Sequence, residues 1–285
     1  MISYNRLIIL LLLVCSCQTQ TGKLKVVADL PLTLSEVSGI AMDKSNNVIW
    51  MINDSGNKPV LYGVDNNGDI IKTKKIKAKN RDWEDLTMDL NGNLYIGDFG
   101  NNDNDSKALR ILKISKEQLS SKKKTIKPEI IKFSYPEQKK FPPKKNKRHY
   151  DCEAFFHFNN ELFLFTKSRV KKEKGKTHLY KLPTTAGKHK AELIDTYTTC
   201  NDDECWVTSA DINNTGSKMV LLTGNSVLVF SNLNANDFFK SKMERYKFTY
   251  GSQKESVIFK NDSTLLIADE YLGTSGGSVY EFKIN

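Results

Sequence analysis

Short runs of apolar residues, separated by Asn, Gly and Asp, recur along the chain beyond residue 30. The recurring unit is a Glu or Ser, a short apolar strand, a polar turn and a second apolar strand. Five segments carry it: EVSGIAMDKSNNVIWMINDSGN from Glu36, WEDLTMDLNGNLYIGDFGNN from Trp83, CEAFFHFNNELFLFTKSR from Cys152, VTSADINNTGSKMVLLTGNS from Val207 and KESVIFKNDSTLLIADEY from Lys254. Each segment is therefore predicted to form a β-hairpin.

The spacing of these hairpins predicts the fold class. Taking one Glu or Ser from the start of each unit as equivalent, the steps are 46, 69, 56 and 46 residues. This period suits four-stranded propeller blades joined by connectors of variable length. Weaker alternating runs after the hairpins, such as PVLYGVD and DIIKTKKI, supply the outer strands. The sequence shows no long amphipathic helix, which disfavours helical repeats.

The fifth unit lacks one outer strand, and the segment KLKVVAD (Lys23–Asp29) at the front of the chain can supply it. Pairing the first strand with the last blade would close the ring and remove two open sheet edges. The sequence thus predicts an all-β fold: one five-bladed β-propeller domain over residues 23–285, closed by its N-terminal strand. Six blades remain an alternative, because the long connector Ser115–His149 could hold further structure.

The N-terminus has the features of an export signal. Arg6 precedes the apolar run LIILLLLVCSC, which is too short to span a bilayer. Val14 and Ser16, at −3 and −1 from Cys17, resemble a bacterial lipobox, so residues 1–16 are predicted to be a lipoprotein signal peptide and Cys17 the acylated residue. A plain cleaved signal and a retained anchor are the alternatives. We expect an exported protein of the bacterial cell envelope, held at the outer membrane or cell surface only by its lipid anchor.

The other cysteines fit an exported protein. Cys200 and Cys205 bracket NDDE, a spacing compatible with a disulfide in an oxidising compartment. Cys152 would then be left as a buried free thiol. A nucleophilic role for Cys152 is the alternative, and it would require a nearby base.

The chain of 285 residues has a formal net charge of +10, and its composition, 39% hydrophobic and 27% charged, is that of a globular protein. Much of the positive charge lies in SSKKK, QKKFPPKKNKR and VKKEKGK, which are predicted to be solvated connectors. A nucleic-acid surface would interleave aromatic residues with the charge on a regular element. We therefore expect a monomer with no nucleic-acid partner, while attraction to small anions or lipid headgroups stays open.

The residues that begin the five hairpins are candidate metal ligands, because the first strand of every propeller blade lines the central channel. Confined carboxylates must protonate or acquire a cation. Oxygen donors without His or Cys favour Ca²⁺, which takes about 6–8 such ligands, and Mg²⁺ is the second choice. The predicted ring is Ser38, Glu84, Glu153, Ser209 and Glu255. The alternative is that each acid only satisfies local amides, and Trp83 is expected to pack between blades.

The segments EVSGIAM, WEDLTMDLNGNLYIG, CEAFFHF, TSADI and KESVIF resemble, in this order, the inner strands of the calcium-activated nucleotidase (soluble apyrase) family. This resemblance implies a five-bladed propeller with one axial Ca²⁺ and a ring in the order Ser, Glu, Glu, Ser, Glu. The family's Asp-Asp-Arg-Thr-Gly loop is replaced here by NDSGN, in which Asp54 matches the second acid and the arginine is missing. The chain is also similar to uncharacterised exported bacterial propellers, including phytase-like ones.

The loops after the second strands should lie at the same mouth as the ring, since the second strand runs antiparallel to the first. Asp54 is predicted to be the catalytic base. The predicted substrate contacts are Asn57, Asp98, Asn101, Lys167, Arg169 and Glu270. With a metal ion, this set suits hydrolysis of a phosphoanhydride or phosphoester. Turn chemistry is the alternative for the acids of these loops, and plain solvation for the cations.

Two functions therefore stay open. The first is a Ca²⁺-dependent hydrolase of nucleotides or similar small anionic substrates. The second is a non-catalytic surface propeller that binds a glycan, peptide or protein partner, with Ca²⁺ in a structural role. A lactonase-like or phytase-like hydrolase is a further alternative, because fold alone does not determine function.

Overall fold

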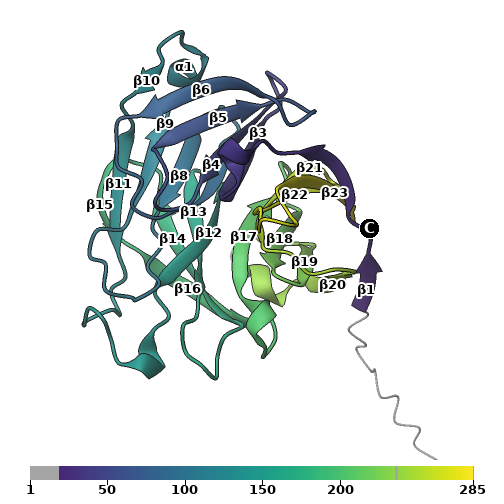
Figure 1. The fold of residues 1–285 in the computed structure, drawn as a ribbon. Coiled ribbons are helices and arrows are strands. Elements are labelled where there is room, and N and C mark those ends of the chain that lie inside the picture. Colours follow the sequence, from purple (N-terminus) through teal and green to yellow (C-terminus); the bar gives the residue numbers. More distant parts are fainter. Residues whose placement is uncertain (1–18, 235–236, 285) are drawn as a thin grey trace, which may run out of the picture.

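The computed structural model describes residues 19–234 and 237–284 and arranges them as a five-bladed β-propeller (Figure 1). Each blade is one sheet with four antiparallel strands, which follow one another from the centre outward. The inner strands contact one another in chain order, and the inner strand of the last blade contacts that of the first. The predicted fold class is confirmed.

The first two blades contain the first two predicted hairpins. Blade 1 consists of β3 (Val37–Asp43), β4 (Val48–Asn53), β5 (Val60–Val64) and β6 (Ile70–Ile76). Blade 2 consists of β7 (Trp83–Met88), β8 (Leu94–Asp98), β9 (Arg110–Ile114) and β11 (Glu129–Ser134). The long connector holds this outer strand together with α1 (Lys116–Ser120), β10 (Thr125–Ile126) and η2 (Lys145–Lys147). The connector contains no sixth blade.

The remaining blades follow the same plan. Blade 3 consists of β12 (Asp151–Phe158), β13 (Glu161–Lys167), β14 (Lys176–Pro183) and β16 (Glu192–Thr198). Blade 4 consists of β17 (Val207–Ile212), β18 (Lys218–Thr223), β19 (Ser226–Ser231) and β20 (Lys242–Phe248), with the short helices η3 (Asp203–Cys205) and η4 (Phe238–Lys240) nearby in sequence. Blade 5 consists of β21 (Lys254–Asn261), β22 (Thr264–Asp269), β23 (Ser278–Lys283) and β2 (Lys25–Asp29), and η1 (Leu32–Leu34) follows β2.

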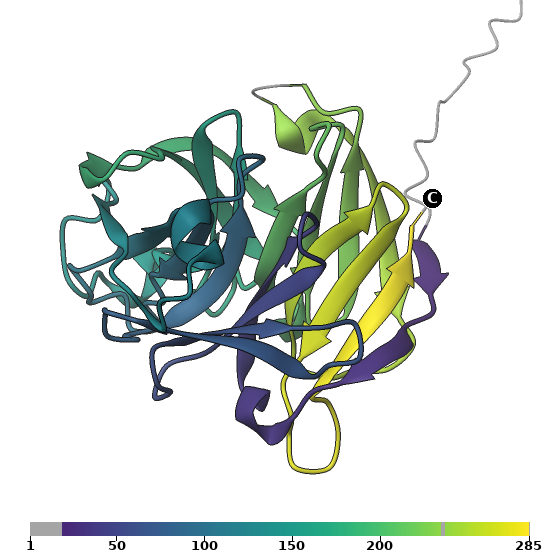
Figure 2. The same cartoon turned by 90° about the horizontal axis from the view of Figure 1, so that it is seen from above.

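The N-terminal strand closes the ring, as predicted. Strand β2 pairs antiparallel with β23, with Lys25 opposite Glu281 and Val26 opposite Tyr280. Figure 2 shows this purple strand beside the yellow C-terminal strand. Three short strands that the sequence did not predict add parallel edges to neighbouring blades. They are β1 (Thr19–Gly22) beside β20, β10 beside β6, and β15 (Gly187–Lys190) beside β11.

The hydrophobic core is divided into five clusters, and each cluster lies between two neighbouring blades. Trp83 is fully buried between blades 1 and 2, as expected. Cys152 is a buried free thiol between blades 2 and 3, and burial raises the pKa of that thiol. Burying these apolar side chains between sheets stabilises the arrangement of the blades around the axis.

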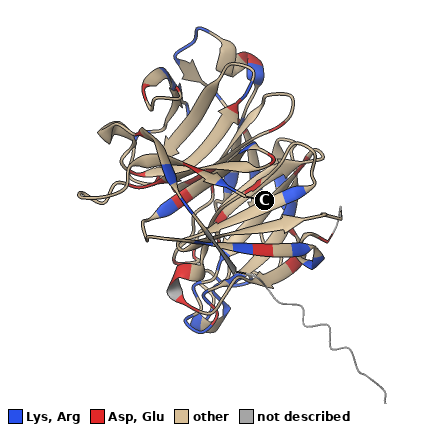
Figure 3. Cartoon of the chain, turned by 90° about the vertical axis from the view of Figure 1, so that its right-hand side faces the viewer, with Lys and Arg blue, Asp and Glu red and all other residues tan. Residues whose placement is uncertain are grey.

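The predicted signal peptide and the lipidation site Cys17 lie outside the described residues. Among the residues that are described, no helix has the length and apolar character needed to cross a bilayer. In the view of Figure 3, Lys and Arg are spread over several strands and loops and alternate with Asp and Glu.

Candidate functional site

Each inner strand begins with a β-bulge, in which one residue is left between two paired positions. A bulge turns a side chain away from the regular pleat, and such irregularities are common beside active sites. The bulged residues are Ser38, Glu84, Glu153, Thr208 and Glu255. Four of them are the predicted ring residues. In the fourth blade the register places Thr208 at this position, and Ser209, which the sequence analysis chose, pairs regularly with Leu222.

The two bulged hydroxyls connect neighbouring blades. Ser38 Oγ donates to the carbonyl oxygen of Trp83 at 2.7 Å, and Thr208 Oγ1 donates to the carbonyl oxygen of Lys254 at 2.8 Å. Both side chains are buried. Each of the two hydroxyls donates to the residue directly before the bulged residue of the next blade, which supports Thr208 as the bulged residue of the fourth blade. Each hydroxyl uses its proton for this bond, so both positions link neighbouring inner strands.

The next residue of each inner strand belongs to a layer around the channel, and hydrogen bonds of its side chains join three of the five pairs of neighbouring blades. Three side chains of this layer accept hydrogen bonds from backbone amides of the following blade. The bonds run from Phe155 N to Asp85 Oδ2 at 3.2 Å, from Val257 N to Ser209 Oγ at 3.1 Å and from Ile40 N to Ser256 Oγ at 2.8 Å. Ser209 Oγ also donates to Asp85 Oδ2 at 3.2 Å.

The other two members of this layer are Gly39 and Ala154, and all five residues are buried. The layer, hereafter the waist, is Gly39, Asp85, Ala154, Ser209 and Ser256. It separates the predicted mouth from the opposite end of the channel. Burial raises the pKa of Asp85 well above its ordinary value, although three hydrogen bonds to its carboxylate oppose the shift.

Three carboxylates gather at the mouth, on the outer side of the waist. Asp54 follows β4, Asp82 directly precedes β7, and Glu84 is the bulged residue of β7. Each offers an oxygen atom, and these atoms lie within 4.8 Å of one another. Gly100 packs against this group, because a Cβ atom there would overlap the side chains of Glu84 and Asp82. The structure thus unites the predicted base Asp54 with one predicted metal ligand and with Asp82, which the sequence analysis did not assign.

The pKa values of these acids are raised, mainly because the acids are buried. Burial and the nearby Asp54 raise the pKa of Asp82 to about 6. Burial, followed by repulsion from Glu153, holds the pKa of Glu84 well above its ordinary value. Burial also raises the pKa of Asp54, despite a hydrogen bond from the Ser55 amide. Charged carboxylates this close are unfavourable without a proton or a cation.

Glu153 lies beside basic residues instead. Its Oε2 is 3.1 Å from Lys167 Nζ and its Oε1 is 3.1 Å from Arg169 Nη2, while Arg169 Nε lies 2.5 Å from Asp151 Oδ2. Burial alone would raise the pKa of Glu153, but Lys167 and Arg169 outweigh burial and lower it. The two predicted phosphate contacts therefore lie near the mouth and are already paired with buried carboxylates.

Trp206 supports these cations and was not found by the sequence analysis. Lys167 Nζ lies 5.2 Å and the guanidinium carbon of Arg169 5.3 Å from the centroid of its indole ring, a geometry that favours cation–π attraction. The indole Nε1 donates to the carbonyl oxygen of Ser168 at 2.8 Å. In the sequence, only its position directly after Cys205 could have indicated that Trp206 lies near the site.

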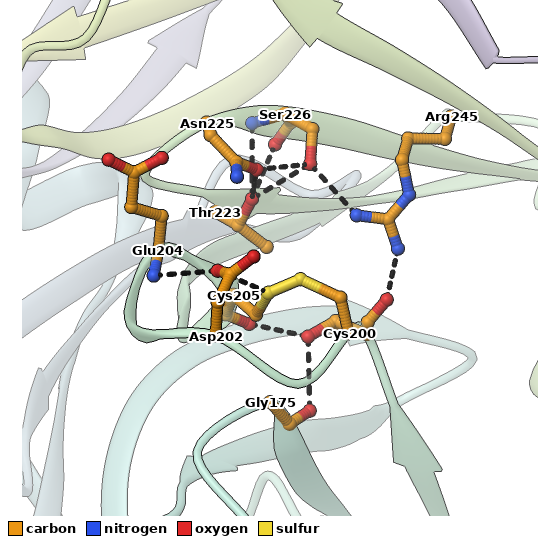
Figure 4. The surroundings of a disulfide bond; sticks show 10 residues. Gly175, Cys200, Asp202, Glu204, Cys205, Thr223, Asn225, Ser226 and Arg245 are labelled. Atoms are coloured by element: carbon orange, nitrogen blue, oxygen red, sulfur yellow. Dashed lines mark hydrogen bonds between the residues drawn. A yellow bond between two sulfur atoms is a disulfide. The ribbon is translucent and has the colours of Figure 1, made fainter.

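The predicted disulfide joins Cys200 to Cys205 (Figure 4). It closes the loop that leads into Trp206 and β17. Within this loop the amide of Glu204 donates to Asp202 Oδ1 at 3.0 Å. Directly before the loop, the Thr199 hydroxyl donates to the carbonyl oxygen of Gly175 at 3.0 Å. The disulfide thus fixes the chain beside the cationic side of the mouth.

Two further acids at the mouth titrate near neutral pH. Burial raises the pKa of Glu255 to about 8, although Lys167 opposes the shift. Burial, followed by repulsion from Asp54 and Glu36, raises the pKa of Glu270 to about 7. Titratable groups with such pKa values are common at catalytic sites.

The other predicted substrate contacts differ in whether their side chains are free to contact a ligand. Asp98 is buried, pairs with Arg110 and accepts the amides of Arg81 and Asp82. Asn101 is buried as well, and its side chain donates to the carbonyl oxygen of Tyr150 and accepts the amide of Ser106. Both side chains therefore organise loops and are not free to contact a ligand. Asn57 stays at the mouth, where its amide donates to Glu36.

Comparisons with known proteins support the fold and give no closer relationship. No family model and no curated protein match the sequence. A gluconolactonase from Xanthomonas campestris superposes with a TM-score of 0.52 at 9% identity, over 92% of this chain and 89% of that one. The PQQ-bound aldose sugar dehydrogenase from Streptomyces coelicolor gives a TM-score of 0.50 at 11% identity, over 93% and 99% of the two chains.

A putative gluconolactonase also gives a TM-score of 0.50, at 9% identity, over 93% of this chain and 92% of that one. These identities are too low to carry an activity from one chain to another, so the similarities show a propeller fold. The resemblance to the soluble apyrase family receives no support from the comparisons.

Proposed function

We propose that the protein is a Ca²⁺-dependent hydrolase whose site is the acid-lined mouth of the propeller. The observation that carries this proposal is the convergence of Asp54, Asp82 and Glu84, whose oxygens lie within 4.8 Å of one another. Their raised pKa values indicate that burial and mutual repulsion make the ionised cluster unfavourable without a counter-ion.

The chemistry of these side chains fits Ca²⁺. All three donors are carboxylate oxygens, which suit a hard cation, and Ca²⁺ tolerates flexible geometry with about 6–8 oxygen ligands. The proposed ligand set differs from the predicted ring. Only Glu84 is common to both, since Ser38 and Ser209 are hydrogen-bonded to the protein and Glu153 is paired with two cations.

A bound cation would polarise a substrate oxygen and lower the pKa of a water molecule. Glu270 is the proposed proton acceptor, because it lies at the same mouth, close enough to Asp54 for their charges to interact. Its pKa of about 7 leaves a large fraction ionised at neutral pH, as general base catalysis requires. Lys167 and Arg169 position Glu153 and place positive charge next to the cluster.

The charge of the mouth favours a substrate with little negative charge. Among the cations beside this group of acids, Lys167 and Arg169 are already paired with carboxylates. Lys174 lies over the Trp206 ring, with its Nζ 5.3 Å from the ring centroid. A polyphosphate would need free cationic groups, whereas an ester, a lactone or a singly charged phosphoester needs only one oxygen on the metal ion. The gluconolactonases with a similar fold make lactones a reasonable part of the test. The Cys200–Cys205 disulfide supports the proposal that the protein is exported.

A non-catalytic propeller with a structural Ca²⁺ is the second candidate. It is favoured by the ion pairs of Lys167 and Arg169 with Glu153 and Asp151, which leave the mouth without the free phosphate contacts that the sequence predicted. In this case the cation would stabilise the inner strands and turnover would be absent.

The experiment combines calcium binding with a substrate panel. Ca²⁺ at about 100 times its dissociation constant should stabilise the fold by about 2.7 kcal/mol and raise the melting temperature by roughly 5–10 °C. Glu84→Gln should abolish most of this shift, and the control Asp69→Asn, an exposed acid in the β5–β6 turn, should retain it. Lactones, carboxylic esters, phosphoesters and nucleoside diphosphates are then assayed with Ca²⁺ and with chelator.

The outcomes separate the candidates. Chelator-sensitive hydrolysis that is reduced by Glu270→Gln supports the hydrolase. A calcium-dependent melting shift without turnover on any substrate supports the structural role of the ion. A melting temperature that does not respond to Ca²⁺ rejects both.

A further inference from the structure

A second hollow lies at the end of the propeller opposite the acid-lined mouth. It has a volume of about 620 Å³, within the range of about 300–1,000 Å³ that is typical of small-molecule sites. Its walls come from the turns that join the first two strands of blades 1 to 4, and its floor comes from the ends of the inner strands. We refer to it as the turn-side cavity.

The turn-side cavity is separate from the proposed hydrolytic site. The waist lies between the two ends of the channel, and none of its five residues lines the cavity. Asp85, Ser209 and Ser256 in this layer are buried, and each accepts a hydrogen bond from a backbone amide of the following blade. A ligand in the cavity would therefore not contact the carboxylates of the mouth.

One acid and one cation face the cavity. Asp211 lies on β17 and lines the cavity floor, and its Oδ2 accepts a hydrogen bond from the amide of Phe259 at 2.7 Å. Lys44, in the β3–β4 turn, also lines the cavity, close enough to Asp211 for their charges to interact, and it forms no ion pair with any described residue. The cavity thus lacks the group of acids that lines the mouth: among the described residues Lys44 is its one full charge at neutral pH, and Asp211, whose pKa burial raises to about 7, is partly protonated.

Free side-chain amides supply most of the remaining polar groups. Asn159 and Asn160 have φ values of 49° and 62°, so the turn itself explains their presence. Asn91 and Asn214 are not in the left-handed region, and their side chains make no hydrogen bond within the described part of the chain. Each can both donate and accept, which matches the hydrogen-bonding capacity of a sugar hydroxyl.

Apolar surface lies between these polar groups. Met42, Met88 and Phe158 line the cavity, and Leu90 at its rim is 78% exposed. His157 lines the wall with its ring stacked on Tyr95, and burial lowers the pKa of His157, so the imidazole is neutral. Amides beside aliphatic and aromatic surface are complementary to a saccharide, which has hydroxyls at its edge and C–H groups on its faces.

We propose that the turn-side cavity binds the end of a neutral oligosaccharide, with Asp211, Asn91, Asn214 and Lys44 as the hydrogen-bonding residues. The uncommitted amides, the apolar walls and the small number of charged groups carry this assignment. A protein with this cavity would hold a glycan on one face of the propeller and carry its metal-dependent site on the other.

The test measures binding of neutral sugars to the whole exported domain in the presence of chelator. Maltotriose, cellotriose and tri-N-acetylchitotriose are the probes, and ATP and citrate are the charged comparators, with saturation-transfer NMR and calorimetry as readouts. At pH 8, where most of Asp211 is ionised, Asp211→Asn should weaken saccharide binding about tenfold, the usual effect of losing a hydrogen bond to a charged group. Asn214→Trp, which would fill the cavity from an exposed turn, should abolish binding.

The control Asn67→Trp, at an exposed turn outside the cavity, should bind the sugars as the natural chain does. Circular dichroism of each variant establishes that the fold is retained. Absence of binding by every neutral probe, preference for the charged comparators, or binding that both cavity variants leave unchanged would each overturn the proposal. Glu84→Gln, which changes the mouth, should retain sugar binding. Failure of the hydrolase proposal would therefore leave the sugar-binding proposal intact, and failure of the sugar-binding proposal would leave the hydrolase proposal intact.

Discussion

Replacing Gly39 with Ala tests the close approach of the inner strands on which the waist depends. A Cβ atom at Gly39 would lie 2.7 Å from Leu86 N and 2.8 Å from the carbonyl carbon of Asp85. Both atoms belong to the backbone of β7, so no side-chain rotation can relieve the overlap. Strands β3 and β7 would have to separate by several tenths of an ångström along the interface that buries Trp83.

Overpacking of this kind costs about 1–3 kcal/mol. In a domain of this size we expect the melting temperature to fall by roughly 2–12 °C. The measurement is urea and thermal unfolding of Gly39→Ala beside the control Gly251→Ala. A Cβ atom at Gly251 would have no neighbouring atom within 4 Å, and its φ is not left-handed, so this replacement should be neutral or slightly stabilising. Equal stability of both variants would show that the inner strands do not approach one another as described.

Two further predictions concern the links between blades and the buried acids. Thr208→Val should destabilise the domain by about 1 kcal/mol in urea unfolding, because the carbonyl oxygen of Lys254 loses its donor; an unchanged midpoint would contradict the assigned register. In chelator, stability should fall as the pH rises from about 6.5 to 7.5. Glu255, Glu270 and Asp211 have pKa values of about 8, 7 and 7, so the folded state keeps protons that the unfolded state has already lost. This contribution to the free energy of unfolding is full below the unfolded pKa of a carboxyl and is lost as the pH rises past the folded pKa. Added Ca²⁺ should reduce the slope of stability against pH. A rise in stability over this pH range would refute the assignment.

Much of the fold was predictable because it follows from local pattern. The hairpin of Trp83 is an example: alternating apolar residues on both sides of an Asn-Gly turn specify two paired strands. Five such hairpins at a blade-like spacing specify a propeller, and the unpaired KLKVVAD segment indicated how the ring closes. The short parallel strands β1, β10 and β15 were not predicted, since they depend on pairing with edges that only the assembled blades present.

The candidate site was less predictable because it depends on side-chain partners. Lys167 and Arg169 were correctly placed near the acids, but a sequence cannot show that Glu153 and Asp151 already neutralise them. Asp82 is next to Trp83 in the sequence, and its association with Asp54 arises only when the β4 loop meets β7 across two blades.

The sequence by itself determined the propeller fold class, the strand that closes the ring and the acids that begin the inner strands; it favoured five blades over six and a Cys200–Cys205 pair, and the structure has both. These features follow from alternation of apolar residues, turn chemistry and cysteine spacing, which act over a few residues. Only the tertiary structure decided that Thr208 and not Ser209 completes the bulge positions, that the waist divides the channel, and that a second cavity lies beyond it. These features depend on a register within one blade and on hydrogen bonds between backbones far apart in the chain, which become defined only when the five blades pack around a common axis.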